Sequence, residues 1–213
     1  MRFTQFHCRR LRGCDCIGEH LNFKYEICFL GNNINSIQKT YDIQLHKIKA
    51  QLYKRKFQTV GKGLYIVGRP LIHGKGKILA GTNLYLNSLS CRIEIFAGEN
   101  AEIRLGNNVI INQGVDIGAL QRIEIGDETM IGDQTTVFDS DFHGIDGNPI
   151  KTSPVIIGKH VWICAKVIIL KGVSIGDNSI VGAGSVVTKD IENNTIVVGN
   201  PAKKIGITRA GYT

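Results

Sequence analysis

The sequence lacks a hydrophobic run long enough to cross a membrane. Across its 213 residues no apolar stretch approaches the ~18 residues that a membrane-spanning helix needs. The basic start of the chain is not followed by the apolar segment of a secretory signal. These two absences predict a cytoplasmic protein, and free thiols are the expected state of cysteines in that compartment.

Cysteine spacing typical of zinc sites is also missing. Four of the six cysteines fall within the first 28 residues, but none forms the CxxC pair of a zinc knuckle. Zinc binding stays open for one group of side chains, namely Cys8, Cys14, Cys16 and His20. A short thiol-containing segment without metal is the favoured interpretation.

Acidic residues are scarce in the N-terminal part of the chain. Residues 1–60 carry eleven Lys and Arg against four Asp and Glu, whereas residues 61–213 carry fifteen against fourteen. Nucleic acid is a weak explanation, because no known binding motif is present and no aromatic platform interleaves with the basic residues. A solvated basic face is the favoured interpretation of this surplus, and contact with an anionic membrane surface or an acidic glycan is the alternative.

A repeat of six residues runs through most of the chain. Aliphatic residues head the C-terminal units, at Ile157, Ile163, Ile169, Ile175, Val181 and Val187. The same spacing occurs earlier, at Ile66, Ile72, Ile78 and Leu84, at Leu105, Ile111 and Ile117, and, after a two-residue insertion, at Ile125, Ile131 and Val137. Six residues are three strand repeats and do not keep one face of a 3.6-residue helix, so the units are predicted to be short strands.

Glycine, asparagine and aspartate recur between these strands, in "GNN", "GDE", "GDQ" and "GDN". They tolerate the left-handed backbone of tight corners. Three units then close a triangular coil, and stacked coils pair their strands in parallel around a column of aliphatic side chains. The predicted fold is all-β, a parallel β-helix of hexapeptide repeats. Its open ends need caps, for which residues 1–60 and the tail "PAKKIGITRAGYT" are the candidates.

Residues 1–60 do not share the repeat. They contain apolar residues at helical spacing, which predict one amphipathic helix: Ile37, Tyr41, Leu45, Ile48 and Leu52. Core packing is the favoured use of this stripe, with membrane or partner binding as the alternative. The chain is thus divided into a basic, partly helical extension or cap (1–60), a β-helix domain (61–206) and a C-terminal tail (207–213).

The segment 155–206 contains "GVSIGDNSIVGAGSVVTKDI" and "GNPAK". It resembles the C-terminal half of hexapeptide-repeat acyltransferases, nearest to the maltose and galactoside O-acetyltransferases, the xenobiotic acetyltransferases and the polysaccharide O-acetyltransferases. The resemblance covers about residues 60–206. It implies a left-handed coil, a homotrimer with active sites between subunits, and direct transfer from acetyl-CoA without an acyl-enzyme.

The repeat is interrupted at residues 138–154, and the interruption contains His143. Acyl transfer to a hydroxyl needs a base, and a free imidazole, with a pKa near 6.5, is mostly neutral at cytosolic pH. The resemblance places the catalytic histidine in this loop, so His143 is predicted to be the general base. Three flanking acids are expected to orient the imidazole or bind acceptor hydroxyls: Asp139, Asp141 and Asp146.

Asn112 matches the asparagine that, in the family, hydrogen-bonds the acceptor hydroxyl or the intermediate. An amide can donate to an oxyanion without competing for the proton. The alternative is a corner asparagine in a left-handed turn. Eight residues on, the galactoside enzymes carry an acidic residue where this chain has Leu120, and the loop after His143 is shorter. Both departures argue against a galactoside- or maltose-like acceptor.

The resemblance also implies the residues that bind CoA. Trp162 lies beside the expected pantetheine groove, with core packing as its alternative, and Ala165 and Ala183 match positions whose backbone contacts pantetheine. Positions that meet the adenosine and its phosphates match Thr188, Lys189 and Lys203. A second basic position of some relatives is Gly206 here, and Lys204 or Arg209 could replace it. Cys164 occupies a small-residue slot and is interpreted as packing.

No metal is expected in the β-helix. A carbonic-anhydrase-like zinc site would need three ladder histidines, two of them in an HxxxxH pair, which the sequence lacks, and His160 is interpreted as an exposed corner residue. The sequence therefore predicts an acetyl-CoA-dependent O-acetyltransferase acting on a sugar or polysaccharide hydroxyl. Two alternatives stay open, an N-acetyltransferase acting on an aminosugar and a noncatalytic β-helix used for assembly.

Overall fold

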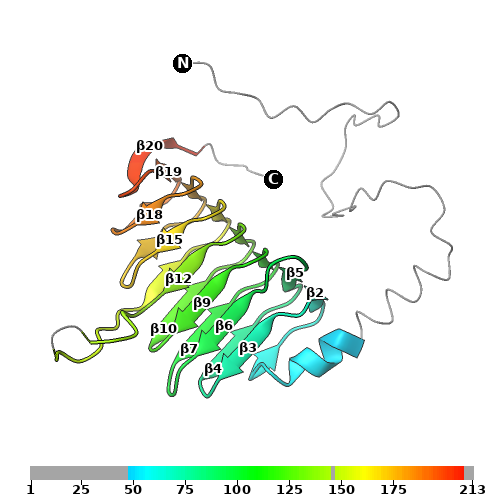
Figure 1. Ribbon diagram of the computed structural model, residues 1–213. Helices are drawn as coiled ribbons and strands as arrows, with labels where there is room; N and C mark the ends of the chain where they lie inside the picture. Colours follow the sequence, from blue (N-terminus) through cyan, green and yellow to red (C-terminus); the bar gives the residue numbers. More distant parts are fainter. Residues whose placement is uncertain (1–47, 145–146, 209–213) are drawn as a thin grey trace, which may run out of the picture. The chain divides into compact units, whose positions relative to one another are not determined.

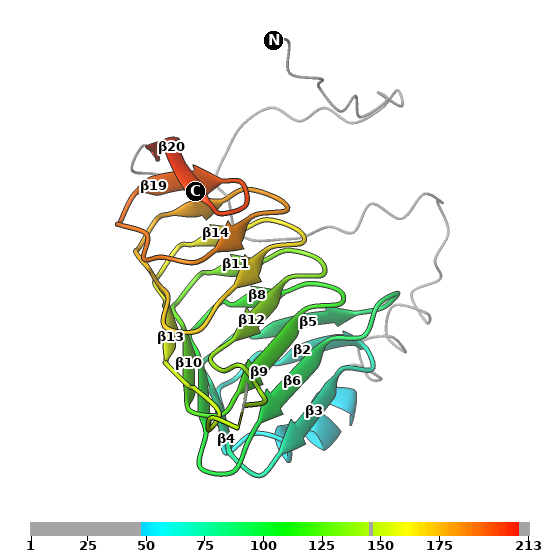
Figure 2. The same cartoon turned by 60° about the vertical axis from the view of Figure 1, so that its left-hand side comes forward.

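The fold is a solenoid of short strands, which confirms the predicted parallel β-helix of hexapeptide repeats. The structure is a computed structural model that describes residues 48–144 and 147–208. Its strands form three sheets, here called sides A, B and C, and every pairing except that of the last two strands is parallel. Strands of successive coils lie one above another (Figures 1 and 2).

Up to β18, each side takes every third strand, and β19 and β20 both join side B. Side A consists of β1 (Thr59–Val60), β4 (Lys77–Ala80), β7 (Glu102–Leu105), β10 (Arg122–Ile125), β13 (Val155–Ile157) and β16 (Ser174–Ile175). Side B consists of β2 (Tyr65–Gly68), β5 (Tyr85–Ser88), β8 (Ile110–Ile111), β11 (Met130–Ile131), β14 (Trp162–Ile163), β17 (Ile180–Val181), β19 (Thr195–Val198) and β20 (Lys203–Ile207). Side C consists of β3 (Leu71–Gly74), β6 (Glu94–Ala97), β9 (Asp116–Ala119), β12 (Thr136–Phe138), β15 (Ile168–Ile169) and β18 (Val186–Val187).

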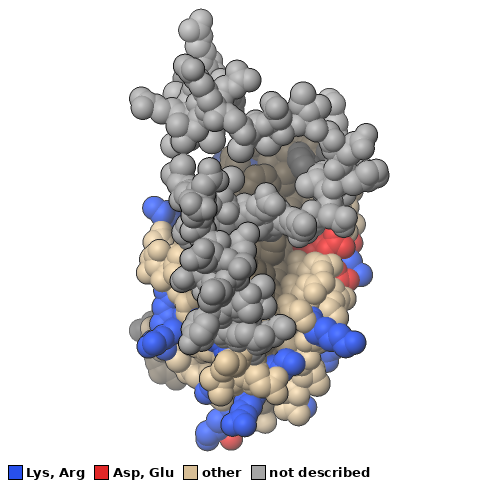
Figure 3. All heavy atoms as spheres, turned by 90° about the vertical axis from the view of Figure 1, so that its right-hand side faces the viewer, with Lys and Arg blue, Asp and Glu red and all other residues tan. Residues whose placement is uncertain are grey.

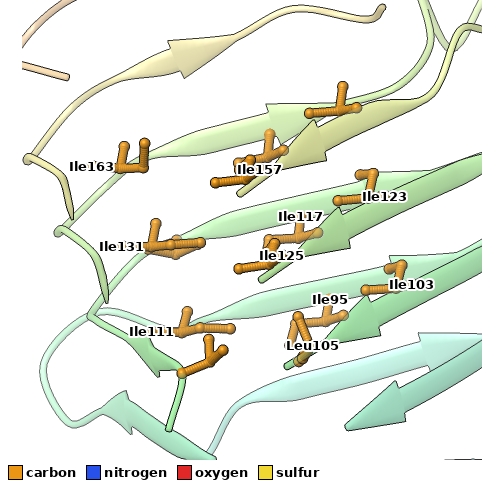
Figure 4. Packing of buried hydrophobic residues seen from close by; sticks show 14 of the residues in the cluster. Ile95, Ile103, Leu105, Ile111, Ile117, Ile123, Ile125, Ile131, Ile157 and Ile163 are labelled. Atoms are coloured by element: carbon orange, nitrogen blue, oxygen red, sulfur yellow. The ribbon is translucent and has the colours of Figure 1, made fainter. Parts of the chain in front are cut away.

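The heads of the six-residue units point into the coil. Ile111, Ile131 and Ile163 are register partners on side B, and each is fully buried. Figure 4 shows these residues stacked with the heads of sides A and C along the axis. Because burying one such side chain contributes about 1.5–3 kcal/mol, the aliphatic column stabilises the coil along its whole length.

The corners adopt the left-handed backbone that their composition predicts. Asn108, Glu128, His160 and Asn178, which follow the strands of side A in successive coils, have φ between 53° and 58°. His160 lies at the corner predicted for it. The buried Thr129 satisfies its hydroxyl by donating to the Gly158 carbonyl at 2.8 Å.

A short helix, residues 48–54, precedes the first strand. Ala50 and Phe57 are buried in the core, and the Tyr53 hydroxyl donates to the Pro70 carbonyl at 3.0 Å. Ile48 and Leu52, by contrast, are 59% and 61% exposed. The expectation that their stripe packs in the core is therefore wrong for these two residues, because the neighbouring helix face carries the core contacts. The rest of the stripe lies outside the described residues.

The C-terminal end of side B has a different pairing. β20 runs antiparallel to β19, so it ends the parallel ladder, as the predicted cap requires. The buried Thr208 hydroxyl donates to the Asn178 carbonyl at 2.8 Å and attaches this end to the preceding coil. Within the described residues, no helix is long and apolar enough to cross a bilayer.

Candidate active site

The interrupting loop leaves the solenoid after β12 on side C and returns at β13 on side A. Its two arms pair close to the solenoid: the Ser153 amide donates to the Asp139 carbonyl at 2.8 Å, and Ser140 and Thr152 form an antiparallel bridge. The Asp141 amide donates to the Lys151 carbonyl at 3.2 Å. The ends of the loop are thus held as a hairpin whose outer part projects from the coil (Figure 1).

Asp139 holds the start of this loop against the solenoid. Its side chain is fully buried, and its carboxylate accepts hydrogen bonds from the amides of Leu120, Gln121 and Arg122 at 2.6–2.8 Å. These amides belong to the corner that contains the two-residue insertion of the repeat. The carboxylate has no exposed surface for an acceptor sugar, so the structure gives Asp139 a structural role in place of the expected acceptor contact.

His143 is exposed, and one of its ring nitrogens has a partner. Nδ1 lies 3.0 Å from the carbonyl oxygen of Asp141. A carbonyl can only accept, so Nδ1 carries the hydrogen and, in the neutral ring, Nε2 keeps a lone pair. The ring borders a pocket of about 230 Å³ that is lined by Asp141, His143, Asn148, Pro149 and Lys151. The arrangement provides a base at the edge of a cavity.

The group that orients His143 is a main-chain carbonyl. The Asp141 carboxylate instead lies 2.5 Å from the Lys171 ammonium, and both side chains are about one-third exposed. This ion pair joins the loop to the following coil. Asp141 thus contributes its backbone to the imidazole and its side chain to the anchoring of the loop. Asp146, the third acid expected here, lies outside the described residues.

Asn112 lies at the other edge of side C from the loop. It follows β8 at the corner between sides B and C, and its backbone amide donates to the Ile131 carbonyl at 3.0 Å. Its backbone is not left-handed, so Asn112 is not explained by the alternative role of a corner asparagine in a left-handed turn. The chain needs the six residues from Asn112 to Gly118 to cross side C, roughly 15–20 Å. Asn112 and the start of the loop that carries His143 therefore lie at opposite edges of side C.

Four of the expected CoA residues lie at the same two edges, and Trp162 and Lys203 lie on side B. Ala165 and Ala183 lie at the edge between sides B and C, as Asn112 does, and the Trp162 side chain is 47% exposed on side B. The Ala165 carbonyl accepts from the Gly184 amide at 3.0 Å, so this carbonyl already takes part in the ladder. Beside it, burial raises the pKa of the Cys164 thiol, which fits packing and disfavours a nucleophile.

The remaining CoA candidates are exposed. Thr188 and Lys189 follow β18 at the edge between sides C and A, where the loop also leaves, and Lys203 begins β20. Lys204 pairs with Glu192 at 3.2 Å, whereas none of the ion pairs found among the described residues involves Lys189 or Lys203. These two lysines are therefore the better placed for a phosphate. Arg209 lies outside the described residues.

Comparison with known proteins gives several related sequences. Residues 154–189 match the bacterial transferase hexapeptide family, described as six repeats. A Schizosaccharomyces pombe protein named as an acetyltransferase is 32% identical over 78% of this chain and 85% of its own length. WbbJ of Escherichia coli, named for O-acetyl transfer in lipopolysaccharide biosynthesis, is 31% identical over 63% of this chain and 74% of its own length.

The chain belongs to the hexapeptide-repeat acyltransferases. Galactoside O-acetyltransferase of Escherichia coli is 33% identical over 52% of this chain, but the match spans only 57% of that protein. Among solved structures, a mutant of the N-acyltransferase AntD of Bacillus cereus, in complex with dTDP and coenzyme A, has a TM-score of 0.58 and 29% identity over 75% of this chain and 89% of its own. The polysialic-acid-specific acetyltransferase NeuO has a TM-score of 0.53 and 25% identity over 73% and 82%.

This hexapeptide-repeat acyltransferase also uses residues that the sequence analysis did not single out. Lys171 anchors the loop through Asp141, and Phe142 packs against the solenoid beside His143. No repeat position or motif marks either residue, because both act through contacts between segments of different coils. The one signal in the sequence was an aromatic residue next to the candidate base.

Proposed function

We propose that this chain is an acetyl-CoA-dependent O-acetyltransferase that modifies a hydroxyl of a sugar or surface polysaccharide. The donor is supported by the coenzyme A bound to the structural relative AntD. The acceptor class is supported by two relatives, of which WbbJ is named for lipopolysaccharide biosynthesis and NeuO for polysialic acid. The single observation that carries the proposal is the orientation of His143.

In the proposed reaction, Nε2 of His143 removes the proton of the acceptor hydroxyl while the oxygen attacks the thioester carbonyl. The carbonyl π electrons move to its oxygen, and the Asn112 side-chain amide donates to this oxyanion. Collapse of the tetrahedral intermediate breaks the carbon–sulfur bond. The CoA thiolate then takes the proton from the imidazolium, so the base is restored without an acyl-enzyme.

The proposed site requires two copies of the chain. Two groups that act on one carbonyl must each come within ~3 Å of it, whereas Asn112 and His143 lie at opposite edges of side C. In the proposed closed ring, the edge between sides B and C of one copy meets the edge between sides C and A, where the loop leaves, of the next copy. A homotrimer of this kind also brings Ala165 and Ala183 opposite Thr188 and Lys189 of the neighbour, on either side of the bound CoA.

The test of the base is the replacement of His143 by alanine. Removal of a general base reduces turnover by about 10²–10⁴-fold, while CoA affinity should stay within about twofold, since the loop is not expected to hold the nucleotide. Turnover is followed by thiol release from acetyl-CoA against sugars, nucleotide sugars and surface glycans, and CoA binding by calorimetry. Exposed His160 at a corner provides the matched control, His160→Ala. Native turnover in His143→Ala would refute the proposed role.

An amine acceptor is the second candidate, because the structural relative AntD is an N-acyltransferase. A protonated amine must lose a proton before it can attack, so amine acetylation falls more steeply with decreasing pH than hydroxyl acetylation does. The pH profile of kcat/KM with each active acceptor separates the two. If kcat/KM continues to fall at pH values below the range in which the base becomes protonated, the acceptor is an amine.

The N-terminal end of the solenoid suggests contact with an anionic membrane surface. No acidic residue is present between Asp42 and Glu94, and Ile48 and Leu52 are exposed beside the basic side chains of residues 48–62. Figure 3 shows Lys and Arg at the lower end of one face, with few acidic side chains in view. Basic residues attract anionic headgroups, and the two apolar side chains favour a lipid surface over a soluble polyanion.

Sedimentation with vesicles of phosphatidylcholine and phosphatidylglycerol tests this contact. We expect binding that weakens with salt and falls by about tenfold when Ile48 and Leu52 are both changed to serine. Leu89→Ser, at an exposed position of the solenoid, is the control. Vesicle binding that depends on charge but not on Ile48 and Leu52 would refute the insertion of these two side chains into lipid.

A further inference from the structure

The residue before His143 is packed against the solenoid. The Phe142 ring makes an edge contact with Phe138, with 4.9 Å between the ring centroids and 71° between the ring planes. Phe96 lies 6.3 Å from it on the other side and in turn contacts His73 at 5.0 Å. These partners are outward-facing residues of side C. Phe142 therefore ties the first arm of the hairpin to the coil, next to the candidate base.

Gly118 provides the space for this ring. It is the register partner of both Phe96 and Phe138, so it lies between them on the outer surface of side C. A Cβ atom at Gly118 would lie 2.6 Å from Cζ of Phe142 and 3.1 Å from two ring atoms of Phe138. The backbone of Gly118 is not left-handed, so alanine could adopt its conformation. Glycine is needed here because of the ring above it.

Phe142 also has an unusual backbone. Its φ is +57°, in the left-handed region that costs a residue with a Cβ about 1–2 kcal/mol. Such a conformation persists only where the surroundings determine it. The contacts of the Phe142 ring with Gly118 and Phe138 hold the backbone in this conformation. Phe142 is half-buried, and the exposed His143 follows it directly.

The peptide that links Asp141 to Phe142 connects this packing to the imidazole. The carbonyl that accepts from Nδ1 of His143 belongs to that peptide, and a peptide is planar. A shift of Phe142 therefore moves both the backbone that carries His143 and the carbonyl that holds its tautomer. A misplacement of about 1 Å at a catalytic group can reduce turnover by about 10²-fold.

We infer that Gly118 and Phe142 form a socket and plug that position His143 for proton transfer. The inference rests on the proposed function only for its effect on turnover. Phe142 acts through His143 and is a positioning residue, and Gly118 acts through Phe142. The socket lies within one protomer, so it sets the imidazole before any neighbour or substrate is bound.

The test combines Gly118→Ala, Phe142→Leu and the double variant. Gly118→Ala should lower kcat by about 10–100-fold and leave the KM for acetyl-CoA within about twofold. Phe142→Leu removes the atom that a Cβ at position 118 would strike. The double variant should therefore turn over no more slowly than Phe142→Leu alone, a non-additive result that a separate structural effect of Gly118 would not produce.

A second readout does not depend on activity. Nitrogen-15 NMR of the histidine ring should show the tautomer with hydrogen on Nδ1 in the wild-type chain and a mixture in Gly118→Ala, at a temperature where both are folded. Losses that add in the double variant, or an unchanged tautomer in a folded Gly118→Ala, would overturn the inference. If His143→Ala keeps native turnover, the proposed function fails, while the tautomer measurement still decides the socket.

Discussion

The opposite placement of Asn112 and His143 leads to a quantitative prediction about mixed oligomers. His143→Ala and Asn112→Ala each remove one partner, and each variant alone should lose about 10²-fold or more in turnover. In a random 1:1 mixture, a site between two copies has an even chance of receiving an intact His143 and an even chance of receiving an intact Asn112. About 25% of the sites are then complete, and turnover should recover to about that share of the wild type.

The assay is co-expression of the two variants in equal amounts with the same affinity tag, so that every combination of copies is purified, followed by measurement of thiol release. His143→Ala expressed alone provides the background. A complementary mixture combines wild-type chain with the double variant. It should retain about 25% of the wild-type activity if each site uses two copies and about 50% if each site lies within one copy.

The two mixtures distinguish the arrangements without knowledge of the natural acceptor, because any acceptor that gives turnover serves. Recovery in the first mixture excludes a misfolding explanation for either single variant. No recovery in the first mixture, together with about 50% in the second, would refute the argument that side C separates the two residues.

Three further predictions concern single residues. Asp139→Asn replaces an acceptor of three amide hydrogen bonds and should lower the free energy of unfolding by about 2–4 kcal/mol. The melting temperature should then fall by roughly 5–15 °C at equal protomer concentration. The control Asp133→Asn, at an exposed position, should change it by about 1 °C or less. Burial and the neighbouring Glu94 raise the pKa of Asp116, so ionisation of this carboxyl destabilises the native state above pH 3.8. Asp116→Asn should therefore melt at a higher temperature than the wild type at pH 7. The difference in melting temperature should vanish below pH 3.8, where the carboxyl is protonated in both the native and the unfolded state. Lys189→Ala should raise the apparent constant for CoA about three- to tenfold with kcat little changed, and unchanged CoA affinity in calorimetry would remove Lys189 from the site.

The repeat is the part of the structure that the sequence predicts best. Each head, such as Ile131, lies in a corner-to-corner unit of fixed length, so its direction follows from the period alone. The same regularity marks the loop, since an interruption of a repeat is visible without knowledge of its conformation. His143 was therefore found from its place in the sequence and from the family resemblance.

The roles of the acids could not be derived in that way. Asp139 and Asp141 are both near His143 in the sequence, and both carboxylates have the same chemistry. Asp139 turns inward to the amides of the inserted corner at Leu120, and Asp141 turns to Lys171, which lies thirty residues away in the next coil. Closeness in the sequence carries no information about these contacts, because the coil brings together residues about one turn apart.

By itself the sequence determined the period, the inward aliphatic column, the left-handed corners and the position of the loop, because each depends on local backbone geometry and on burial that repeats every six residues. Only the tertiary structure decided that Ile48 and Leu52 face outward, that Asp139 serves the fold, that Phe142 occupies the space above Gly118, and that Asn112 and His143 lie at different edges. These outcomes depend on which side chains of different coils meet, and that is set by packing in three dimensions and not by any property of the single residue.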